Sequence, residues 1–189
     1  MFNKENSDEQ HLARRLRNGE NGAMEVFYSL YAPTLKTICS RYISDNEEAK
    51  DVFQNALVRI ITHIVGFKYR GEGSLRAWAS KIVMNEALRY LRDKKRHELA
   101  ALDNDVADVA EEDDPPIENI PTEEILQMIK QLPTGYRTVF NLYVFENKSH
   151  EEIAHLLGIK TNTSASQLCK AKNMLATMIR NYNTKNTSR

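Results

Sequence analysis

The stretch EEIAHLLGIKTNTSASQLCKAKNML, Glu151–Leu175, contains a predicted helix, a turn and a second predicted helix. Ile153 and Leu157 give the first helix an apolar face, and the small Ala154 stands where two helices must approach closely. Gly158 follows at the place where the chain must turn. This order of elements is typical of a helix-turn-helix.

The second helix of this pair begins with small polar residues, and the charges that follow are all positive. Thr161–Ser164 supply candidate N-caps. The face opposite its apolar residues carries Ser166, Gln167, Lys170 and Lys172. A recognition helix enters the major groove by its N-terminal end, where small residues allow close approach and lysines can meet phosphate or guanine. The pattern predicts DNA binding, with an ordinary solvated helical hairpin as the alternative for this stretch alone.

Length and composition exclude several classes of protein. The chain has 189 residues, 41% of them hydrophobic, which suffices for packed cores in one domain or two small ones. No apolar run approaches the roughly 20 residues that span a bilayer, and no signal-peptide pattern begins the chain. We therefore expect a cytoplasmic protein without membrane insertion. Cys39 and Cys169 lack a CxxC or His-rich partner, so we predict no metal and no cofactor.

The net charge of zero conceals a strong asymmetry. Residues 1–100 carry 17 Lys and Arg against 13 Asp and Glu, and residues 125–189 carry nine against three. Residues 101–124 carry ten Asp and Glu and no Lys or Arg. Two mildly basic blocks joined by an acidic tether predict two modules that meet one extended polyanion. The alternative is that solvated helix faces are segregated by chance.

Helical spacing recurs along the chain and no alternating strand pattern persists, which predicts an all-α fold. We expect two small helical domains, residues 1–98 and 122–189, joined by a flexible acidic linker, residues 99–121. Pro33 is expected to kink its helix rather than end it, and Ser74 is placed to cap a later one. In the helix after Asp51, the residues predicted to face inward are Val52, Phe53, Ala56, Leu57, Ile60, Ile61 and Ile64.

A second basic segment precedes the linker, in SLRAWASKIVMNEALRYLRDKKR, Ser74–Arg96. Its cations are Arg76, Lys81, Arg89, Arg92, Lys94, Lys95 and Arg96. With the aromatic and glycine-bearing loop FKYRGEGS, Phe67–Ser74, this helix suits a nucleic-acid backbone with bases nearby for stacking. A solvated helix is the alternative for the last three cations. Trp78 and Tyr90 are predicted to lie in the core, and Asn85 is predicted to be a buried hydrogen-bonding residue.

This order of segments resembles an extracytoplasmic-function (ECF) sigma factor of the sigma-70 family. The segments that carry the resemblance are Phe27–Ile61, Ser74–Arg96 and Leu132–Ile159 with the helix that follows. The resemblance implies a transcription initiation factor that binds core RNA polymerase, directs it to −35 and −10 promoter elements and assists promoter melting. Such a factor is not an enzyme, because catalysis belongs to the polymerase.

The resemblance also implies roles for the N-terminal module, which would be region 2. Residues off the apolar stripe of its third helix would face the coiled coil of the largest polymerase subunit; they are Asp51, Gln54, Asn55 and Arg59. The loop 67–74 would take up an unstacked base, and the basic helix would hold the melted strand. The residues predicted to bind the −10 element are Lys68, Arg70, Arg76, Arg89, Arg92, Lys95 and Arg96.

The C-terminal module would be region 4, which reads the −35 element and contacts the polymerase flap. Its predicted DNA-binding residues are Thr163, Ser164, Ala165, Ser166, Gln167, Cys169, Lys170 and Lys172. Several of these replace bulkier or basic residues, so we expect a −35 preference unlike the common one. Arg89 stands where an acidic residue is frequent, which sets the −10 preference in question too. The resemblance further implies an anti-sigma factor that covers both modules.

Other functions stay open on the sequence. A stand-alone helix-turn-helix regulator would bind duplex DNA tightly without polymerase, and a sigma-like interaction protein would sequester an anti-sigma factor without touching DNA. The acidic linker either mimics nucleic acid in a basic channel or serves solubility alone. An enzyme is the weakest alternative, because the five histidines have no partners at nucleophile or metal spacing.

Overall fold

The computed structural model describes the backbone of residues 3–98 and 120–187, and the side chains of residues 8–94 and 120–185. Every regular element within these ranges is a helix, so the predicted all-α fold class is confirmed. Most of the predicted linker lies outside the described residues.

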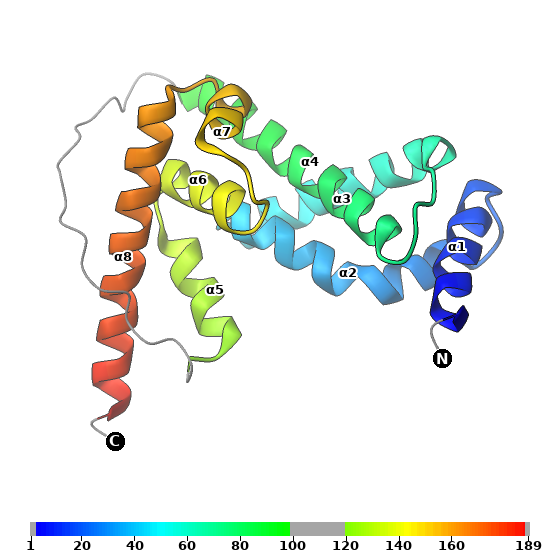
Figure 1. The fold of residues 1–189 in the computed structure, drawn as a ribbon, viewed down its shortest axis with the longest axis horizontal. Helices are drawn as coiled ribbons and strands as arrows, with labels where there is room; N and C mark the ends of the chain where they lie inside the picture. Colours follow the sequence, from blue (N-terminus) through cyan, green and yellow to red (C-terminus); the bar gives the residue numbers. More distant parts are fainter. Residues whose placement is uncertain (1–2, 99–119, 188–189) are drawn as a thin grey trace. The chain divides into compact units, whose positions relative to one another are not determined.

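The chain divides into two units, Met1–Lys94 and Lys95–Arg189, each with buried apolar side chains of its own. The first unit contains α1 (Asn3–Arg17), α2 (Ala23–Tyr42), α3 (Asn46–His63), the 3₁₀ turn η1 (Ile64–Gly66) and most of α4 (Ser74–Glu98). Helix α1 packs against α2 and η1, and α2 pairs with α3 (Figure 1). Pro33 does not end α2, as predicted, and the Thr37 hydroxyl donates a hydrogen bond of 3.0 Å to the Pro33 carbonyl.

The core of the first unit is formed by the inward faces of its helices. Its largest fully buried side chains are Phe27, Leu35, Tyr42, Ile43, Val52, Ile60, Leu75 and Val83. Ile61 was predicted to join them, but it is 52% exposed. Consecutive residues on an α-helix point about 100° apart, so Ile61 turns outward when its neighbour Ile60 faces the core.

The second unit contains α5 (Thr122–Gln131), α6 (Thr134–Val144), α7 (His150–Leu157) and α8 (Thr161–Thr187). The long helix α8 contacts the other three (Figure 1). Ser149 and Glu152 form the predicted capping box at the start of α7, and Gly158 ends that helix with a left-handed φ of 67°. Helices α7 and α8 are therefore the predicted helix-turn-helix.

One face of α8 closes the core of the second unit. The buried side chains of this core are Ile120, Met128, Ile129, Leu132, Ala171 and Leu175, and the partly buried Met178, Ile179 and Tyr182 extend it along α8. Arg137 of α6 is 3% exposed and donates hydrogen bonds to the carbonyls of Lys130 and Leu132, at 2.8 and 2.9 Å. Burial lowers the pKa of Arg137, but its guanidinium remains a cation that satisfies the last carbonyls of α5.

Candidate nucleic-acid and polymerase interfaces

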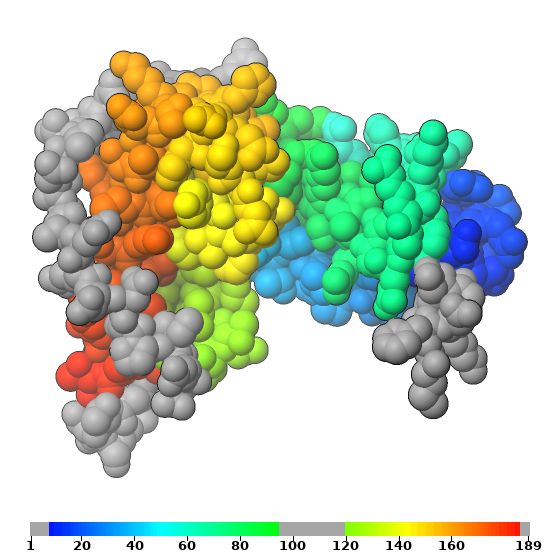
Figure 2. Space-filling model, viewed as in Figure 1, coloured from blue at the N-terminus to red at the C-terminus, as the bar shows by residue number. Residues whose placement is uncertain are grey.

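A row of polar and cationic side chains lies on the exposed face of α4. Its members stand three or four residues apart and so share one side of the helix. This α4 stripe consists of Lys81, Asn85, Arg89 and Arg92. Arg76 is also exposed, but it lies on the opposite side of α4, nine residues before Asn85. Part of the α4 surface lies open in Figure 2, where the helix is green. Two predicted −10 contacts, Arg89 and Arg92, belong to the stripe, whereas the side chains of Lys95 and Arg96 lie outside the described residues.

Asn85 is exposed in the middle of the α4 stripe, so the prediction that it is buried is wrong. The buried polar residue of α4 is its neighbour Glu86, whose side chain is 5% exposed. The periodicity around this position does not distinguish the two, because both are polar and adjacent. An exposed carboxamide between cations can donate and accept hydrogen bonds at base edges.

Glu86 links α3 to α4 beneath the stripe. Its Oε2 lies 2.6 Å from Nε of Arg59 on α3, and its Oε1 pairs with Arg89. A carboxylate this buried needs a cationic partner, because an unpaired charge loses its hydration without compensation. Arg59, predicted to contact polymerase, therefore also holds two helices of the first unit together.

The exposed face of α3 changes from polar to apolar along the helix. Asp51, Gln54 and Asn55 are exposed. Beyond them Val58 is 60% exposed and Ile61 is 52% exposed. We name these five residues the α3 face. Exposed apolar side chains beside polar ones are typical of surfaces that bind another protein.

The loop between η1 and α4, residues 67–73, is anchored where it begins. Phe67 is buried, and its ring centroid lies 5.2 Å from that of Trp78, which is half-buried. Lys68 and Arg70, both predicted to bind the −10 element, are exposed in this loop. Their cationic groups are therefore available to a ligand at the first unit's surface.

The other end of the loop is held by Glu9 of α1, a residue that is 8% exposed. Glu9 Oε2 accepts a hydrogen bond from the backbone N–H of Gly73 at 2.6 Å. Glu9 Oε1 accepts from the backbone N–H groups of Leu75 and Arg76, at 2.9 and 3.3 Å. The first N–H groups of a helix lack intrahelical partners and carry positive partial charge, so a carboxylate stabilises them. Glu9 thus caps α4 from another helix.

Two further hydrogen bonds complete this corner. Ser74, predicted to cap α4, is its first residue, and its hydroxyl accepts from the backbone N–H of Arg70 at 3.2 Å. The Tyr31 hydroxyl donates to Glu9 Oε1 at 3.4 Å. Burial, with the Glu9 carboxylate nearby, raises the pKa of Tyr31 to about 12, so this hydroxyl keeps its proton at neutral pH.

In the second unit, Ser164 lies inside the helix-turn-helix. It is 0% exposed, and its hydroxyl lies 3.0 Å from Nδ1 of His150 on α7. The His150 ring stacks on Tyr143 of α6, with ring centroids 4.8 Å apart. Ser164 therefore joins α8 to α7, and the prediction that it contacts DNA is wrong because its side chain has no exposed surface.

Gln167 lies against the start of α6. A Cβ placed on Gly135 would come within 3.3 Å of Gln167 Nε2, so glycine leaves the space that this carboxamide occupies. The Gln167 side chain is half-buried in this position. To contact DNA, as predicted, it would have to turn away from Gly135.

The other predicted −35 contacts are accessible on α8. Ala165 and Lys172 are exposed, and the residues that are half-exposed are Thr163, Ser166, Cys169 and Lys170. Sequence reasoning missed Thr161 and Asn162, which are exposed in the first turn. Their signal was present, since both belong to the run of small polar residues that begins the helix. Helix α8 contains no Asp or Glu, so its exposed surface carries no negative side chain of its own.

Two sequence models of the sigma-70 proteins match the chain. Sigma-70 region 2 matches residues 27–97 and sigma-70 region 4 matches residues 122–175, so together they cover 125 of 189 residues. The chain belongs to the sigma-70 family. Its function is that of a sigma factor in transcription initiation. The α4 stripe, the α3 face, α7 and the first half of α8 lie within the matched regions.

Relatives assign the chain to the ECF group of this family. The sigma-H factor of Pseudomonas aeruginosa is 28% identical over 178 residues, 87% of this chain and 90% of that protein. The ECF sigma-E factor of Haemophilus influenzae is 27% identical over 182 residues, 90% and 95% of the two chains. The fold is similar to that of the Bartonella quintana sigma factor RpoE, solved in complex with the anti-sigma factor NepR: the TM-score is 0.50 at 19% identity, over 84% and 98% of the two chains.

The described residues contain no group of three or more His, Cys, Asp or Glu side chains that could hold a metal ion. Among the helices described, none combines the length and the apolar character that crossing a membrane requires. Cys39 is buried in region 2, and burial raises the pKa of its thiol to about 12, which disfavours the reactive thiolate.

The buried position of Ser164 leads to a prediction for region 4. Replacing Ser164 with Ala removes its hydrogen bond to His150 and should lower the free energy of unfolding of this unit by about 1 kcal/mol. Affinity for −35 DNA at low temperature should change less than twofold, because the side chain does not reach the surface. Thermal denaturation and DNA titration of the same variant measure the two effects. A tenfold loss of affinity without a loss of stability would restore Ser164 as a DNA contact.

Proposed function

We propose that the two units divide promoter recognition between them. Region 2, residues 1–98, binds core RNA polymerase through the α3 face and the −10 element through the α4 stripe and the loop 67–73. Region 4, residues 122–189, binds the −35 element through the first turns of α8 and meets the polymerase flap. Residues 99–121 connect them. In this account the polymerase supplies catalysis in the cytoplasm, and the chain acts without a cofactor.

The observation that carries this proposal is the pair of cationic surfaces in separate units. The α4 stripe holds three cations, and the carboxylate beneath it, that of Glu86, is buried and paired. Helix α8 begins with a turn that has no acidic residue, and Lys170 and Lys172 follow further along the same helix. Phosphate contacts from such cations supply affinity. The exposed Asn85 carboxamide on α4 and the small residues at the start of α8 allow the approach to bases.

We assign the −35 contact to a set of residues that differs from the predicted one, with Thr161 and Asn162 in place of Ser164 and Gln167. The set comprises Thr161, Asn162, Thr163, Ala165, Ser166, Cys169, Lys170 and Lys172. In region 2 we add Asn85 and Lys81 to the −10 contacts, because both are exposed on the α4 stripe. Arg89 remains among the −10 contacts, although its guanidinium is also paired with the Glu86 carboxylate.

We also propose an anti-sigma factor as a partner. The RpoE structure of similar fold contains such a factor, NepR. Apolar side chains that a protein partner would cover are exposed on region 2, among them Val58 and Ile61 of the α3 face and Leu30 of α2, which is 60% exposed. An anti-sigma factor that covers the α3 face would compete directly with polymerase.

The test is selection of promoters from random duplex DNA by core polymerase carrying the chain. We expect two enriched blocks at the spacing of −35 and −10 elements. Lys170→Ala with Lys172→Ala should weaken binding, lower the salt slope by about 0.9 for each phosphate that is no longer neutralised, and relax only the upstream block. Lys81→Ala with Arg92→Ala should relax only the downstream block. Enrichment of a single block, or of none, would contradict the division of labour.

A further inference from the structure

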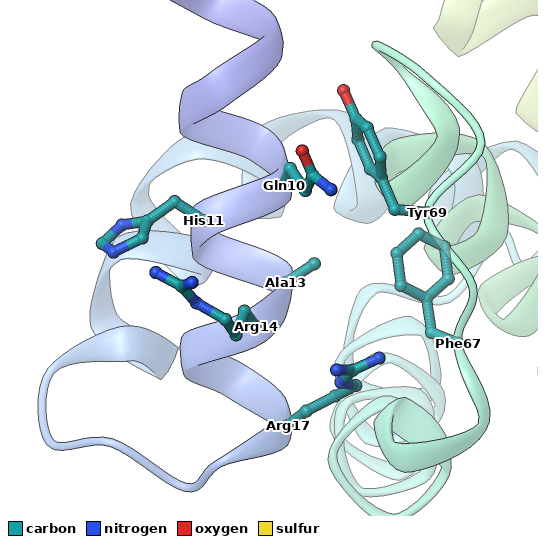
Figure 3. A pocket seen from close by; sticks show the side chains of 7 residues that line it. All are labelled: Gln10, His11, Ala13, Arg14, Arg17, Phe67 and Tyr69. Atoms are coloured by element: carbon teal, nitrogen blue, oxygen red, sulfur yellow. The ribbon is translucent and has the colours of Figure 1, made fainter.

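Two features of the first unit are not explained by the α3 face and the α4 stripe alone. One is a groove of about 330 Å³ between α1 and the loop 67–73, with Arg14, Arg17 and Tyr69 among the residues that line it (Figure 3). This groove adjoins the loop proposed to contact the −10 element and so belongs to that interface. The other feature is the buried carboxylate of Glu86, which joins cations from α3 and α4.

Glu86 holds two arginines that both reach the surface. Its Oε2 lies 2.6 Å from Nε of Arg59 on α3, and its Oε1 pairs with Nη2 of Arg89, one turn further along α4. The side chain of Glu86 is 5% exposed, whereas those of Arg59 and Arg89 are 39% and 45% exposed. A guanidinium has several N–H donors in a rigid fork, so a contact with Glu86 leaves others for a second partner. One buried anion therefore holds two cations that stay accessible to a ligand.

The charge balance of these three side chains decides what Arg89 can offer to DNA. Two guanidinium cations share one carboxylate, so the three groups together keep one positive charge. A buried carboxylate needs a cationic partner, and Arg59 supplies it from α3. Arg89 can therefore turn toward a phosphate without leaving Glu86 unpaired. Without Arg59, Glu86 and Arg89 would neutralise each other, and the pair would carry no net charge to attract DNA.

We propose that Glu86 and Arg59 are positioning residues for promoter recognition. Glu86 holds Arg89 in place on the α4 stripe, and Arg59 offsets the charge of Glu86, so that the charge of Arg89 stays available to DNA. This inference rests on the −10 role proposed for the α4 stripe. It gives Arg59, a residue of the helix that carries the α3 face, an effect on DNA binding that is separate from any contact with polymerase.

The test is a double-mutant cycle on core polymerase carrying the full chain, with affinity for a duplex promoter fragment as the measured quantity. Core polymerase is used at a concentration that saturates every variant, so weaker polymerase binding does not enter the result. Arg89→Ala should lower the affinity about tenfold and the salt slope by about 0.7–0.9, the value for one phosphate. Arg59→Met keeps the aliphatic stem of the side chain but not its charge, and it should have nearly the same two effects. In the double variant the losses should not add, because Arg89 is already neutralised when the Arg59 cation is absent.

Glu86→Gln shows whether the carboxylate is the link. The amide has nearly the shape of the carboxylate but no charge, so Arg89 no longer depends on Arg59. In this background Arg59→Met should change promoter affinity less than about twofold, and Arg89→Ala should still lower it about tenfold. Arg59→Lys in the otherwise unchanged chain should retain most of the affinity, because it keeps the cation. A merely structural role for Glu86 would not produce this pattern.

Two control substitutions match these changes. Lys81 lies two turns before Arg89 on the α4 stripe, and Lys81→Ala should lower promoter affinity by the same factor with and without Arg59→Met. Glu48 of α3 pairs with Lys94 of α4 at 2.6 Å, so Glu48→Gln breaks another ion pair between the same helices and should leave the affinity unchanged. Circular dichroism at low temperature checks that each variant is folded. Arg59→Gln, whose amide can still donate to Glu86, repeats the cycle with a second variant.

The outcomes are distinct. Losses that do not add in the chain with Glu86, but become independent in Glu86→Gln, support the inference. If the effects of Arg59→Met and Arg89→Ala add, or if their coupling persists in Glu86→Gln, the inference is overturned and the proposed function stands. If Arg89→Ala and Lys81→Ala both leave promoter affinity unchanged, the −10 role proposed for the α4 stripe fails, and the inference fails with it.

Discussion

The double variant Asp51→Ala with Gln54→Ala should lose at least about a hundredfold in affinity for core RNA polymerase. Both side chains are exposed at the polar end of the α3 face, so their loss leaves the core of region 2 intact. We expect both to be hot-spot residues, whose truncation costs about 2 kcal/mol or more each, and 1.4 kcal/mol corresponds to a tenfold change. Titration of labelled core polymerase with the variant measures the effect.

A matched control for this variant lies on the same helix. Lys50→Ala removes an exposed side chain that pairs with Glu47, an interaction between exposed groups that contributes less than about 1 kcal/mol, and polymerase affinity should change little. Arg59→Ala should reduce both affinity and stability, because it leaves Glu86 with Arg89 alone. Unchanged affinity in the double variant would remove the α3 face from the polymerase interface.

Replacing Glu9 with Ala should lower the free energy of unfolding of region 2 by about 3 kcal/mol. The change leaves three backbone N–H groups and the Tyr31 hydroxyl without their carboxylate partner. A helix cap contributes about 0.5–2 kcal/mol, and a hydrogen bond to a charged group contributes about 1.5–3 kcal/mol. For a domain of this size the transition temperature should fall by roughly 10 °C or more.

Thermal denaturation followed by circular dichroism measures this loss, with Asp8→Ala as the control. Asp8 precedes Glu9 on α1 and is exposed, so its replacement should shift the transition by only a degree or two. Glu9→Gln should fall between Ala and wild type, because an amide oxygen still accepts hydrogen bonds without the charge. Equal transition temperatures for Glu9→Ala and Asp8→Ala would show that the cap contributes nothing.

Periodicity and capping chemistry predicted most of the fold. The apolar spacing predicted the helices, and Ser149 with Glu152 predicted the start of α7 because a capping box is a local pattern of four residues. Gly158 predicted its end for the same reason, since the left-handed conformation favours glycine at that position. The order of these elements carried the resemblance to the sigma-70 family, and the region 2 and region 4 matches confirm that family.

Three of the errors and omissions concern contacts between residues that are distant in sequence. Glu9 caps α4 from more than 60 residues away, and no local pattern marks an acidic residue of α1 for that role. Glu86 and Asn85 are adjacent and polar, so only the ion pair with Arg59 decides which one is buried. Ser164 belongs to a run of small polar residues whose pattern predicts that all of them are exposed. Its hydroxyl instead lies buried beside His150.

The central claim is that the chain recognises promoters only as part of a complex with core RNA polymerase. A gel shift on a selected promoter fragment tests it most directly, with the chain alone, core polymerase alone and both together. We predict a shifted complex with strand opening only in the mixture, and its loss with Asp51→Ala and Gln54→Ala. Tight binding by the chain alone would contradict the account and favour a stand-alone regulator, and no binding in the mixture would favour a sigma-like interaction protein.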